Sequence, residues 1–411
     1  MNKQFKYQNY VAVSVILTLV GIAVALGQFK IPSIMPAIME RFSMDLGSAS
    51  MLMSVFTLAG IFLSLPTGFL ARRFGAKNMV MASVGVMVVG TLIGMLATSG
   101  SVLVLSRAVE GVALVFCSVS APLVLRKYVA PDKVGFASGI WSLWFSLGSF
   151  FGGVLTPVFF EALDYRGTWI AFAAIVLAAG LLLLFFLRPF SGGRFFESIE
   201  KAAGEIGPAS VSRADAGTGT GTGRKKLFTR NVVLVLLGFL SFNIVLISFL
   251  SFSPTFLQEE GMDPVLAGFA STLPMLIAIV SSPVFGFLAD KTKRYKILMA
   301  LSMVVLGPCA CVLLTSSGPT LWVAACVMGV IGLGAPPMFL IMYPAVVENK
   351  ELMPIAMGFL VMTQSLGQFI GSSVMPFIIE SGWMAAGVFV TVVGLAGTAL
   401  LLLVKSDAIR D

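Results

Sequence analysis

Histidine is absent from the 411-residue sequence, and charged residues are scarce. Without histidine the chain lacks the side chain that most often serves as a general base, a proton relay or a metal ligand. Charged residues make up only 11% of the sequence, against about 25% in soluble proteins. The sequence also shows no nucleophile–base pair, metal cluster or phosphate-binding loop. We therefore predict that the protein is not an enzyme and has no cofactor or bound metal.

Cysteine is rare as well, and its positions exclude two further classes of protein. The four cysteines all lie in apolar stretches, and their spacing matches neither a metal site nor the disulfide framework of a small secreted domain. They are Cys117, Cys309, Cys311 and Cys326. We expect small buried side chains at these positions.

Long apolar runs dominate what remains. The chain is 58% hydrophobic with a mean hydropathy of +0.99, which indicates an integral membrane protein. Spanning a bilayer takes about 20 apolar residues, and we count twelve such runs. They cover 10–39, 46–71, 78–98, 101–128, 134–161, 167–188, 231–257, 264–289, 295–315, 319–347, 352–379 and 382–404. The first run is too long for a signal peptide and lacks a small-residue cleavage site.

The positive charges predict how the chain crosses the membrane. With the N-terminus inside, 23 of the 27 Lys and Arg residues fall on the cytoplasmic side, as the positive-inside rule expects. The net charge of +8 is then a topology signal, and we predict no nucleic-acid partner. We expect a multi-pass protein of the plasma or inner membrane with both termini in the cytoplasm. The other four cations are Lys30, Arg41, Arg107 and Arg166, of which Lys30 and Arg107 fall inside predicted helices.

A change of composition divides the chain into two parts. Between Arg188 and Arg230 the sequence turns to Gly, Ser, Thr and charged residues, which is typical of a flexible linker. We predict one six-helix bundle over 1–190, a cytoplasmic linker over 191–229 and a second six-helix bundle over 230–411. One chain then holds a full set of twelve helices, so we expect a monomer.

Short motifs recur in the two parts at a nearly constant interval. Gly68-Phe-Leu-Ala71 returns 218 positions later as Gly286-Phe-Leu-Ala289, and Val109-x-Gly111 returns as Val327-x-Gly329. Three further matches lie 219 positions apart: Ser146-Leu-Gly148 with Ser365-Leu-Gly367, Gly152 with Gly371, and Pro157 with Pro376. A duplicated six-helix half with a binding site between the halves is common among secondary transporters.

At these motifs the sequence resembles the major facilitator superfamily over nearly its whole length. The loop after the second helix is similar to the family's Gly-x-Leu-Ala-Asp-x-x-Gly-x-Lys/Arg motif, but Arg72 replaces the acid, which the second half keeps as Asp290. The matching residues are Gly68, Leu70, Ala71, Gly75 and Lys77, then Arg107 to Gly111 on helix four, and Gly148, Gly152, Gly153 and Pro157 on helix five. Gln28-Phe-Lys30 and Gly139-Ile-Trp141 look most like the cyanate and nitroimidazole transporter branch. The resemblance implies an all-α fold of two pseudo-symmetric six-helix bundles, alternating access, and a cavity lined by helices one, four, seven and ten.

Lys30 is the charge most out of place. A cation inside a membrane helix is expensive and is a functional hypothesis by default, although a lysine near a helix end can instead snorkel to the headgroups. Counted from the outer surface, Lys30 and Glu110 both lie nine residues deep, roughly 13 Å at the rise of an α-helix. We predict a Lys30–Glu110–Arg107 cluster that binds an anion, with Glu110 as the proton-coupling residue. The alternative is that Arg107 and Glu110 form a pair that only braces helix four.

Other candidates are weaker. Gln28, Trp141, Trp144, Asn243 and Gln364 are predicted substrate contacts, with helix packing as the alternative. The predicted gate residues are Gly68, Arg72, Gly75, Asp290 and Glu351. We expect a contact between Arg72 and Glu351, and a matching contact between Asp290 and the Lys133 end of helix five. The alternative is that these are solvated charges that mark topology.

Together these features predict a secondary active transporter of a small, carboxylate-like anion, coupled to protons and working by alternating access. The expected partners are the small-molecule substrate, the proton and the lipid bilayer. A proton-coupled antiporter for drug or metabolite efflux is the alternative within transport. A non-transporting membrane sensor or receptor on the same fold is the alternative of another class.

Overall fold

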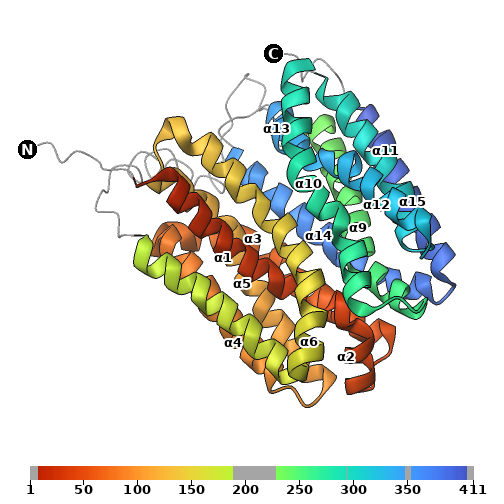
Figure 1. Cartoon of the computed structure of the whole chain (residues 1–411). Helices are drawn as coiled ribbons and strands as arrows, with labels where there is room; N and C mark the ends of the chain where they lie inside the picture. Colours follow the sequence, from red (N-terminus) through yellow and green to blue (C-terminus); the bar gives the residue numbers. More distant parts are fainter. Residues whose placement is uncertain (1–7, 188–227, 293, 348–352, 405–411) are drawn as a thin grey trace, which may run out of the picture.

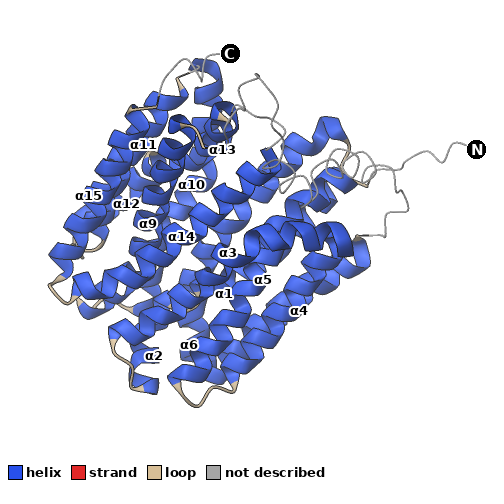
Figure 2. Cartoon of the chain, turned by 180° about the vertical axis from the view of Figure 1, so that it is seen from behind, coloured by secondary structure: helices blue, strands red, loops and turns tan. Residues whose placement is uncertain are grey.

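The computed structural model describes residues 8–187, 228–292, 294–347 and 353–404, and these residues form helices and no strand (Figure 2). The first half comprises α1 (Tyr10–Phe29), η1 (Pro32–Ile34), α2 (Met35–Phe42), α3 (Leu46–Phe74), α4 (Ala76–Met95), α5 (Gly100–Tyr128), η2 (Pro131–Lys133) and α6 (Val134–Phe186). The second half comprises α9 (Arg230–Glu259), α10 (Pro264–Thr292), α11 (Tyr295–Leu313), α12 (Pro319–Val330), η3 (Gly332–Gly334), α13 (Ala335–Val346), α14 (Met353–Ile379) and α15 (Trp383–Leu402).

The helices supply the twelve membrane crossings that the sequence predicts. Ten segments of the described chain are long and apolar enough to span a bilayer. One of them, the 53-residue α6, reverses at Asp164, whose φ of 56° is non-helical, so it makes two crossings. The 27-residue α14 contains no charged residue and makes the twelfth. Two crossings are interrupted, the first at η1 and the tenth at η3.

The two halves lie side by side, with red to yellow-green helices forming one and green to blue helices the other in Figure 1. They meet along two seams, α3 against α14 and α6 against α10. In the described chain α6 ends at Phe186 and α9 begins at Arg230, and nearly all of the predicted linker falls on residues 188–227, outside the described chain. The boundaries of the two bundles therefore stay a prediction.

Opposite ends of the bundle differ in charge. The end that holds the α3–α4, α5–α6 and α10–α11 turns, here called the basic end, includes Arg72, Arg73, Arg126, Lys127 and Lys133. At the other end, here called the acidic end, the described turns and helix termini hold eight carboxylates and only two cations. These are Glu40, Asp45, Glu161, Asp164, Glu259, Glu260, Asp263 and Glu380, with Arg41 and Arg166.

The sequence repeat is a repeat of helix packing. A Cβ on Gly148 of α6 would lie 2.3 Å from the Cβ of Ala25 on α1, and a Cβ on Gly367 of α14 would lie 2.7 Å from the Cβ of Asn243 on α9. Gly111 of α5 lies against the carbonyl of Phe56 in the same way as Gly329 of α12 lies against the carbonyl of Pro274. All these pairs are 218 or 219 positions apart, so both halves share these close contacts between helices.

Two lysines, one in each half, make equivalent hydrogen bonds between helices. Lys77, at the start of α4, donates to the carbonyl of Leu187 after α6, and Lys296, at the start of α11, donates to the carbonyl of Val404 after α15 at 2.7 Å. The last carbonyls of a helix have no partner within it, and a cation there is favoured by the helix dipole. Each lysine therefore ties the last long helix of its half to the third.

Candidate functional site

The first membrane crossing is broken at Lys30. The sequence predicts one run over 10–39, but α1 ends at Phe29, a short 3₁₀ turn follows, and α2 starts at Met35. Pro32 explains the break, because it has no N–H for the carbonyl of Gln28 and its ring would clash with that carbonyl in a continuous helix. Lys30 is the residue at which α1 stops.

Lys30, Glu110 and Arg107 form one buried cluster, which we call the charge cluster. Lys30 Nζ lies 2.5 Å from Glu110 Oε1, and Arg107 Nη1 bonds Glu110 Oε2. Thr91 of α4 donates a third hydrogen bond to Glu110, at 2.8 Å. All three charged side chains are 0% exposed, so the sequence prediction that they meet agrees with the structure and Lys30 does not snorkel to a surface. With two cations and one anion, the charge cluster has a formal net charge of +1.

Arg107 also closes the break in α1. Its guanidinium donates to the carbonyls of Gly27 and Gln28, at 2.6 and 3.2 Å, and to the carbonyl of Leu52 on α3 at 3.0 Å. The ring of Phe56 stacks under it at 4.3 Å. The break frees the carbonyls of Gly27 and Gln28, which would be costly to bury without a donor. Arg107 therefore braces α1 and α3 in addition to its ion pair with Glu110, a wider role than the bracing of helix four that the sequence offers as the alternative.

Lys30 points into the first half. Its ammonium lies 5.0 Å from the ring centre of Trp169 on the second crossing of α6, and its acid partner is on α5. Trp169 and Thr91 are absent from the sequence prediction, because nothing in an isolated apolar helix marks the face that will meet another helix. The indole N–H of Trp169 and the hydroxyl of the nearby Ser106 have no hydrogen-bond partner although both are buried.

The same break contacts the second half. Gln28 Nε2 donates to Gln368 Oε1 of α14 at 3.2 Å, and Gln258 of α9 donates to the carbonyl of Ser33 in η1 at 2.8 Å. Gln28 Oε1 and the hydroxyl of Ser33 are buried without a partner. Gln258 stands beside Glu259 at the end of α9, so no signal in the sequence marks it. Gln368 does carry a signal, because it is an amide inside an apolar helix, one turn after the predicted contact Gln364.

The remaining predicted substrate contacts lie elsewhere. Trp141 and Trp144 stack at 5.4 Å and pack on Gly21 of α1, and their contacts in the structure do not include the charge cluster. Asn243 donates to the carbonyl of Phe239 in its own helix and touches Gly367, which is the helix-packing alternative. Gln364 is partly exposed, one turn before Gln368.

The structure describes some of the predicted gate residues and not others. Gly75 joins α3 to α4 with a φ of 89°, which favours glycine, so its role in the turn is clear. A Cβ on Gly68 would find no atom within 4 Å, and Arg72 is exposed. Glu351 and the side chain of Asp290 lie outside the described residues, so both predicted contacts stay predictions. Lys133 pairs with Asp132, at 3.5 Å.

The two seams differ at the basic end. The α3–α14 seam is packed along its length, from Ser54 against Ser372 to Leu65 against Gly358. The α6–α10 seam is tight towards the acidic end, where Gly153 meets Gly268, and opens towards the basic end into a crevice of about 410 Å³. The lining residues are Phe136, Gly139, Ile140, Ser142, Leu143, Ile279, Ser282, Pro283, Gly286 and Pro337.

Known proteins are similar to this chain in sequence. The sequence profile of the Major Facilitator Superfamily matches residues 17–372 and 261–410. A probable nitrate transporter of Staphylococcus epidermidis is 25% identical over 300 residues, 72% of this chain and 70% of that protein. A nitrite extrusion protein of Bacillus subtilis is 24% identical over 66% of this chain and 64% of its own length. An arabinose-proton symporter of Escherichia coli is 27% identical over 42% of this chain and 36% of its own length.

A solved structure agrees in fold at low identity. A POT family transporter, crystallised with a thioalcohol-conjugated peptide, superposes with a TM-score of 0.73 at 15% identity, over 97% of this chain and 96% of that one. The family match, the twelve crossings and the duplicated halves identify a membrane transporter rather than an enzyme. The chain belongs to the Major Facilitator Superfamily.

Proposed function

We propose that the chain is a secondary transporter of a small anion, coupled to protons through Glu110, in the cell membrane with its basic end in the cytoplasm. The observation that supports this most is the charge cluster: a net positive charge, 0% exposed, at the break in the first crossing and beside the contact between the halves. The orientation follows from the positive-inside rule applied to the two ends.

The charge balance favours an anionic solute. An ion without a full counter-charge costs several kcal/mol in a protein interior, and the charge cluster has one cation more than it has anions. Protonation of Glu110 would raise that excess to two, and a solute with one negative charge would bring it back to one. The relatives described as a nitrate transporter and a nitrite extrusion protein support an anion, and the one described as an arabinose-proton symporter supports a proton.

Coupling follows if the solute and Glu110 compete for Lys30. Lys30 has one carboxylate partner at 2.5 Å, and a protonated Glu110 would hold it less strongly. Lys30 could then take the negative charge of the solute instead, so that one proton and one anion enter together. Arg107 would stay in place on the carbonyls of Gly27, Gln28 and Leu52. Over a full cycle Lys30 would thus pair alternately with Glu110 and with the anionic solute, while Arg107 keeps its hydrogen bonds to the carbonyls of α1.

The test is transport by the purified protein in liposomes. A thermal-shift screen of nitrate, nitrite and small monocarboxylates selects the substrate, and uptake is then measured under an imposed pH gradient and by exchange without one. We expect Glu110→Gln to lose proton-driven uptake and to keep exchange, measured below the unfolding temperature of the variant. Loss of both activities in a folded protein would mean that Glu110 only braces helix α5.

Lys30 is tested in the same liposomes. We expect Lys30→Ala to raise the substrate concentration for half-maximal exchange at least tenfold, and Lys30→Arg, which keeps the charge, to raise it less. Unchanged affinity in both variants would exclude Lys30 from substrate binding. Substrate placed either inside or outside the liposomes also separates uptake from efflux. Substrate binding without any exchange would favour the alternative of a membrane sensor.

A further inference from the structure

The two seams are copies of each other, yet only one is closed at the basic end. By the repeat, Gly139 of α6 corresponds to Gly358 of α14, and Gly286 of α10 corresponds to Gly68 of α3. At Gly358 an added Cβ would lie 2.3 Å from Leu65 Cδ2 across the α3–α14 seam. At Gly139 an added Cβ would find no atom within 4 Å, because the α6–α10 seam has opened into the crevice. Gly286 and its counterpart Gly68 both have open space, so the difference between the seams is the one between Gly139 and Gly358.

Water is a poor occupant of this crevice. Its walls are mainly aliphatic and aromatic side chains, and its two hydroxyl groups are already paired: Ser142 donates to the carbonyl of Gly139 at 2.7 Å, and Ser282 to the carbonyl of Leu333 at 3.1 Å. A buried water needs two to four polar partners, and apolar cavities stay dry or bind apolar molecules. The crevice therefore suits a hydrocarbon group.

The side chains around the crevice indicate that the hydrocarbon group comes from the lipid bilayer. Phe136 at the crevice, and Val284 and Phe287 beside it on α10, are 62%, 55% and 69% exposed, as expected of side chains in contact with lipid. Lys133 lies three residues before Phe136 at the basic end, with its side chain 50% exposed. Its pair with Asp132 is an exposed contact at 3.5 Å, which contributes little to holding it.

We propose that the crevice holds one acyl chain of an anionic phospholipid from the leaflet at the basic end, with the lipid phosphate bound by Lys133. The volume of about 410 Å³ lies within the range of small-molecule sites, and basic residues between membrane helices bind anionic headgroups elsewhere. An acyl chain in this position keeps α6 and α10 apart. The α6–α10 seam can pack like its copy, α3–α14, only after the chain has left.

The glycines allow a matched test. An added Cβ at position 139 or 286 meets no atom within 4 Å, so a leucine there would extend into the crevice. Gly85→Leu is the control, since Gly85 also has open space around it but lies on α4, which does not line the crevice. Lipid binding is measured by native mass spectrometry of the purified protein with phosphatidylglycerol and with phosphatidylcholine. No transport is involved, so the result does not depend on the proposed function.

We expect the wild type and Gly85→Leu to retain one phosphatidylglycerol, and Gly139→Leu and Gly286→Leu to bind it at least tenfold more weakly. Lys133→Ala should lose the preference for phosphatidylglycerol over phosphatidylcholine. Equal retention in the wild type and the three leucine variants would overturn the crevice as the site, and no preference in the wild type would overturn the headgroup contact.

A second measurement covers variants that fold poorly. In a protein without its native cysteines, Gly139→Cys and Lys133→Cys are labelled with a charged, water-soluble thiol reagent. A crevice filled by lipid predicts labelling of position 139 at least a hundredfold slower than of position 133. Comparable rates would mean that the crevice is a water-filled mouth, and the lipid proposal would be wrong.

Discussion

Replacing Glu110 with glutamine removes the single anion between two buried cations, and we predict that it destabilises the protein far more than the loss of Lys30 does. In Glu110→Gln the cations Lys30 and Arg107 remain at 0% exposure with no counter-charge. Removing one partner of a buried ion pair costs about 3–5 kcal/mol. Lys30→Met, in contrast, leaves Arg107 paired with Glu110 and brings the formal charge of the cluster to zero.

The expected cost of Lys30→Met is therefore no more than about 2 kcal/mol, since one charge-assisted hydrogen bond is lost and a net charge is relieved at the same time. Thr91→Val, which removes only the 2.8 Å hydrogen bond to Glu110, is the control, at about 1 kcal/mol. The assay is thermal unfolding in detergent at one fixed scan rate, because unfolding of such proteins is rarely reversible. A Glu110→Gln protein as stable as the wild type would show that Glu110 holds no negative charge in this state, and the charge balance argued above would fail.

Three further results follow from single contacts. Gly111→Ala should prevent normal folding, because its Cβ would lie 2.1 Å from a backbone oxygen of α3; the yield of monodisperse protein should fall, while Gly85→Ala should match the wild type. Gln368→Ala removes the 3.2 Å bond between the halves, worth about 1 kcal/mol, and hydrogen exchange in η1 should become faster; unchanged exchange would show that this bond does not hold the halves. Lys77→Met and Lys296→Met should lower the unfolding temperature by similar amounts, since each removes the equivalent bond in its half, and a large difference would contradict the matching of the halves.

The fold could be predicted from sequence because bilayer thickness fixes the length of each apolar run. The run predicted over 264–289 lies within α10, Pro264–Thr292, and the run predicted over 101–128 within α5, Gly100–Tyr128. The first crossing was less predictable. Pro32 favours a break in principle, but where the helix stops depends on Arg107, which comes from α5 and satisfies the freed carbonyls.

The part of the candidate site that could be predicted is the part that depends only on how deep each residue lies in the membrane. Lys30 and Glu110 were expected to meet because they lie equally far from the outer surface, and they do. Depth says nothing about which face of a helix turns inward, so Trp169 was missed and the substrate contact predicted for Trp141 stays a prediction. The small residue Gly21 makes room for Trp141 against α1, and that pairing depends on how the helices pack.

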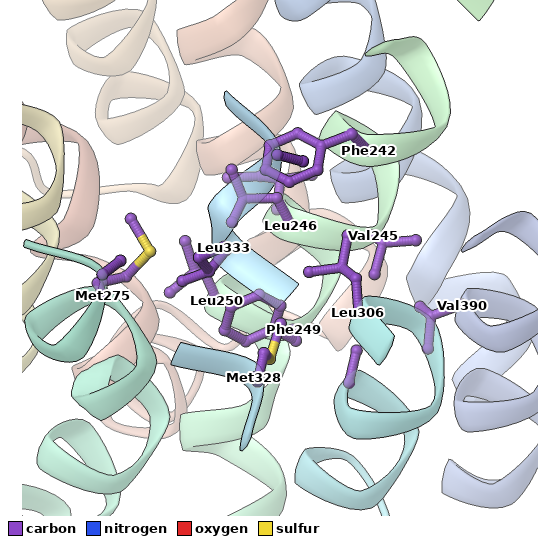
Figure 3. Close-up of a cluster of buried hydrophobic side chains, with 14 of the residues drawn as sticks. Phe242, Val245, Leu246, Phe249, Leu250, Met275, Leu306, Met328, Leu333 and Val390 are labelled. Carbon is purple, nitrogen blue, oxygen red and sulfur yellow. The ribbon is translucent and has the colours of Figure 1, made fainter. Parts of the chain in front are cut away.

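The second half shows that the fold itself does not need the charge cluster. By the repeat, Met328 corresponds to Glu110, and by the packing of α1 on α6 and of α9 on α14, Ser248 corresponds to Lys30. Figure 3 shows Met328 among Phe249, Leu306 and other apolar side chains, in a half with the same backbone contacts.

A six-helix half can thus pack with a methionine and a serine at these positions, so the ions of the first half must be kept for another reason. We therefore predict that Lys30→Ser/Glu110→Met, which removes one buried cation together with the anion and leaves Arg107 on its three carbonyls, is destabilised by less than the about 3–5 kcal/mol expected for Glu110→Gln and does not transport. Thermal unfolding and exchange in liposomes test the two parts separately. A folded double variant that still couples uptake to a pH gradient would show that the charge cluster is a structural remnant.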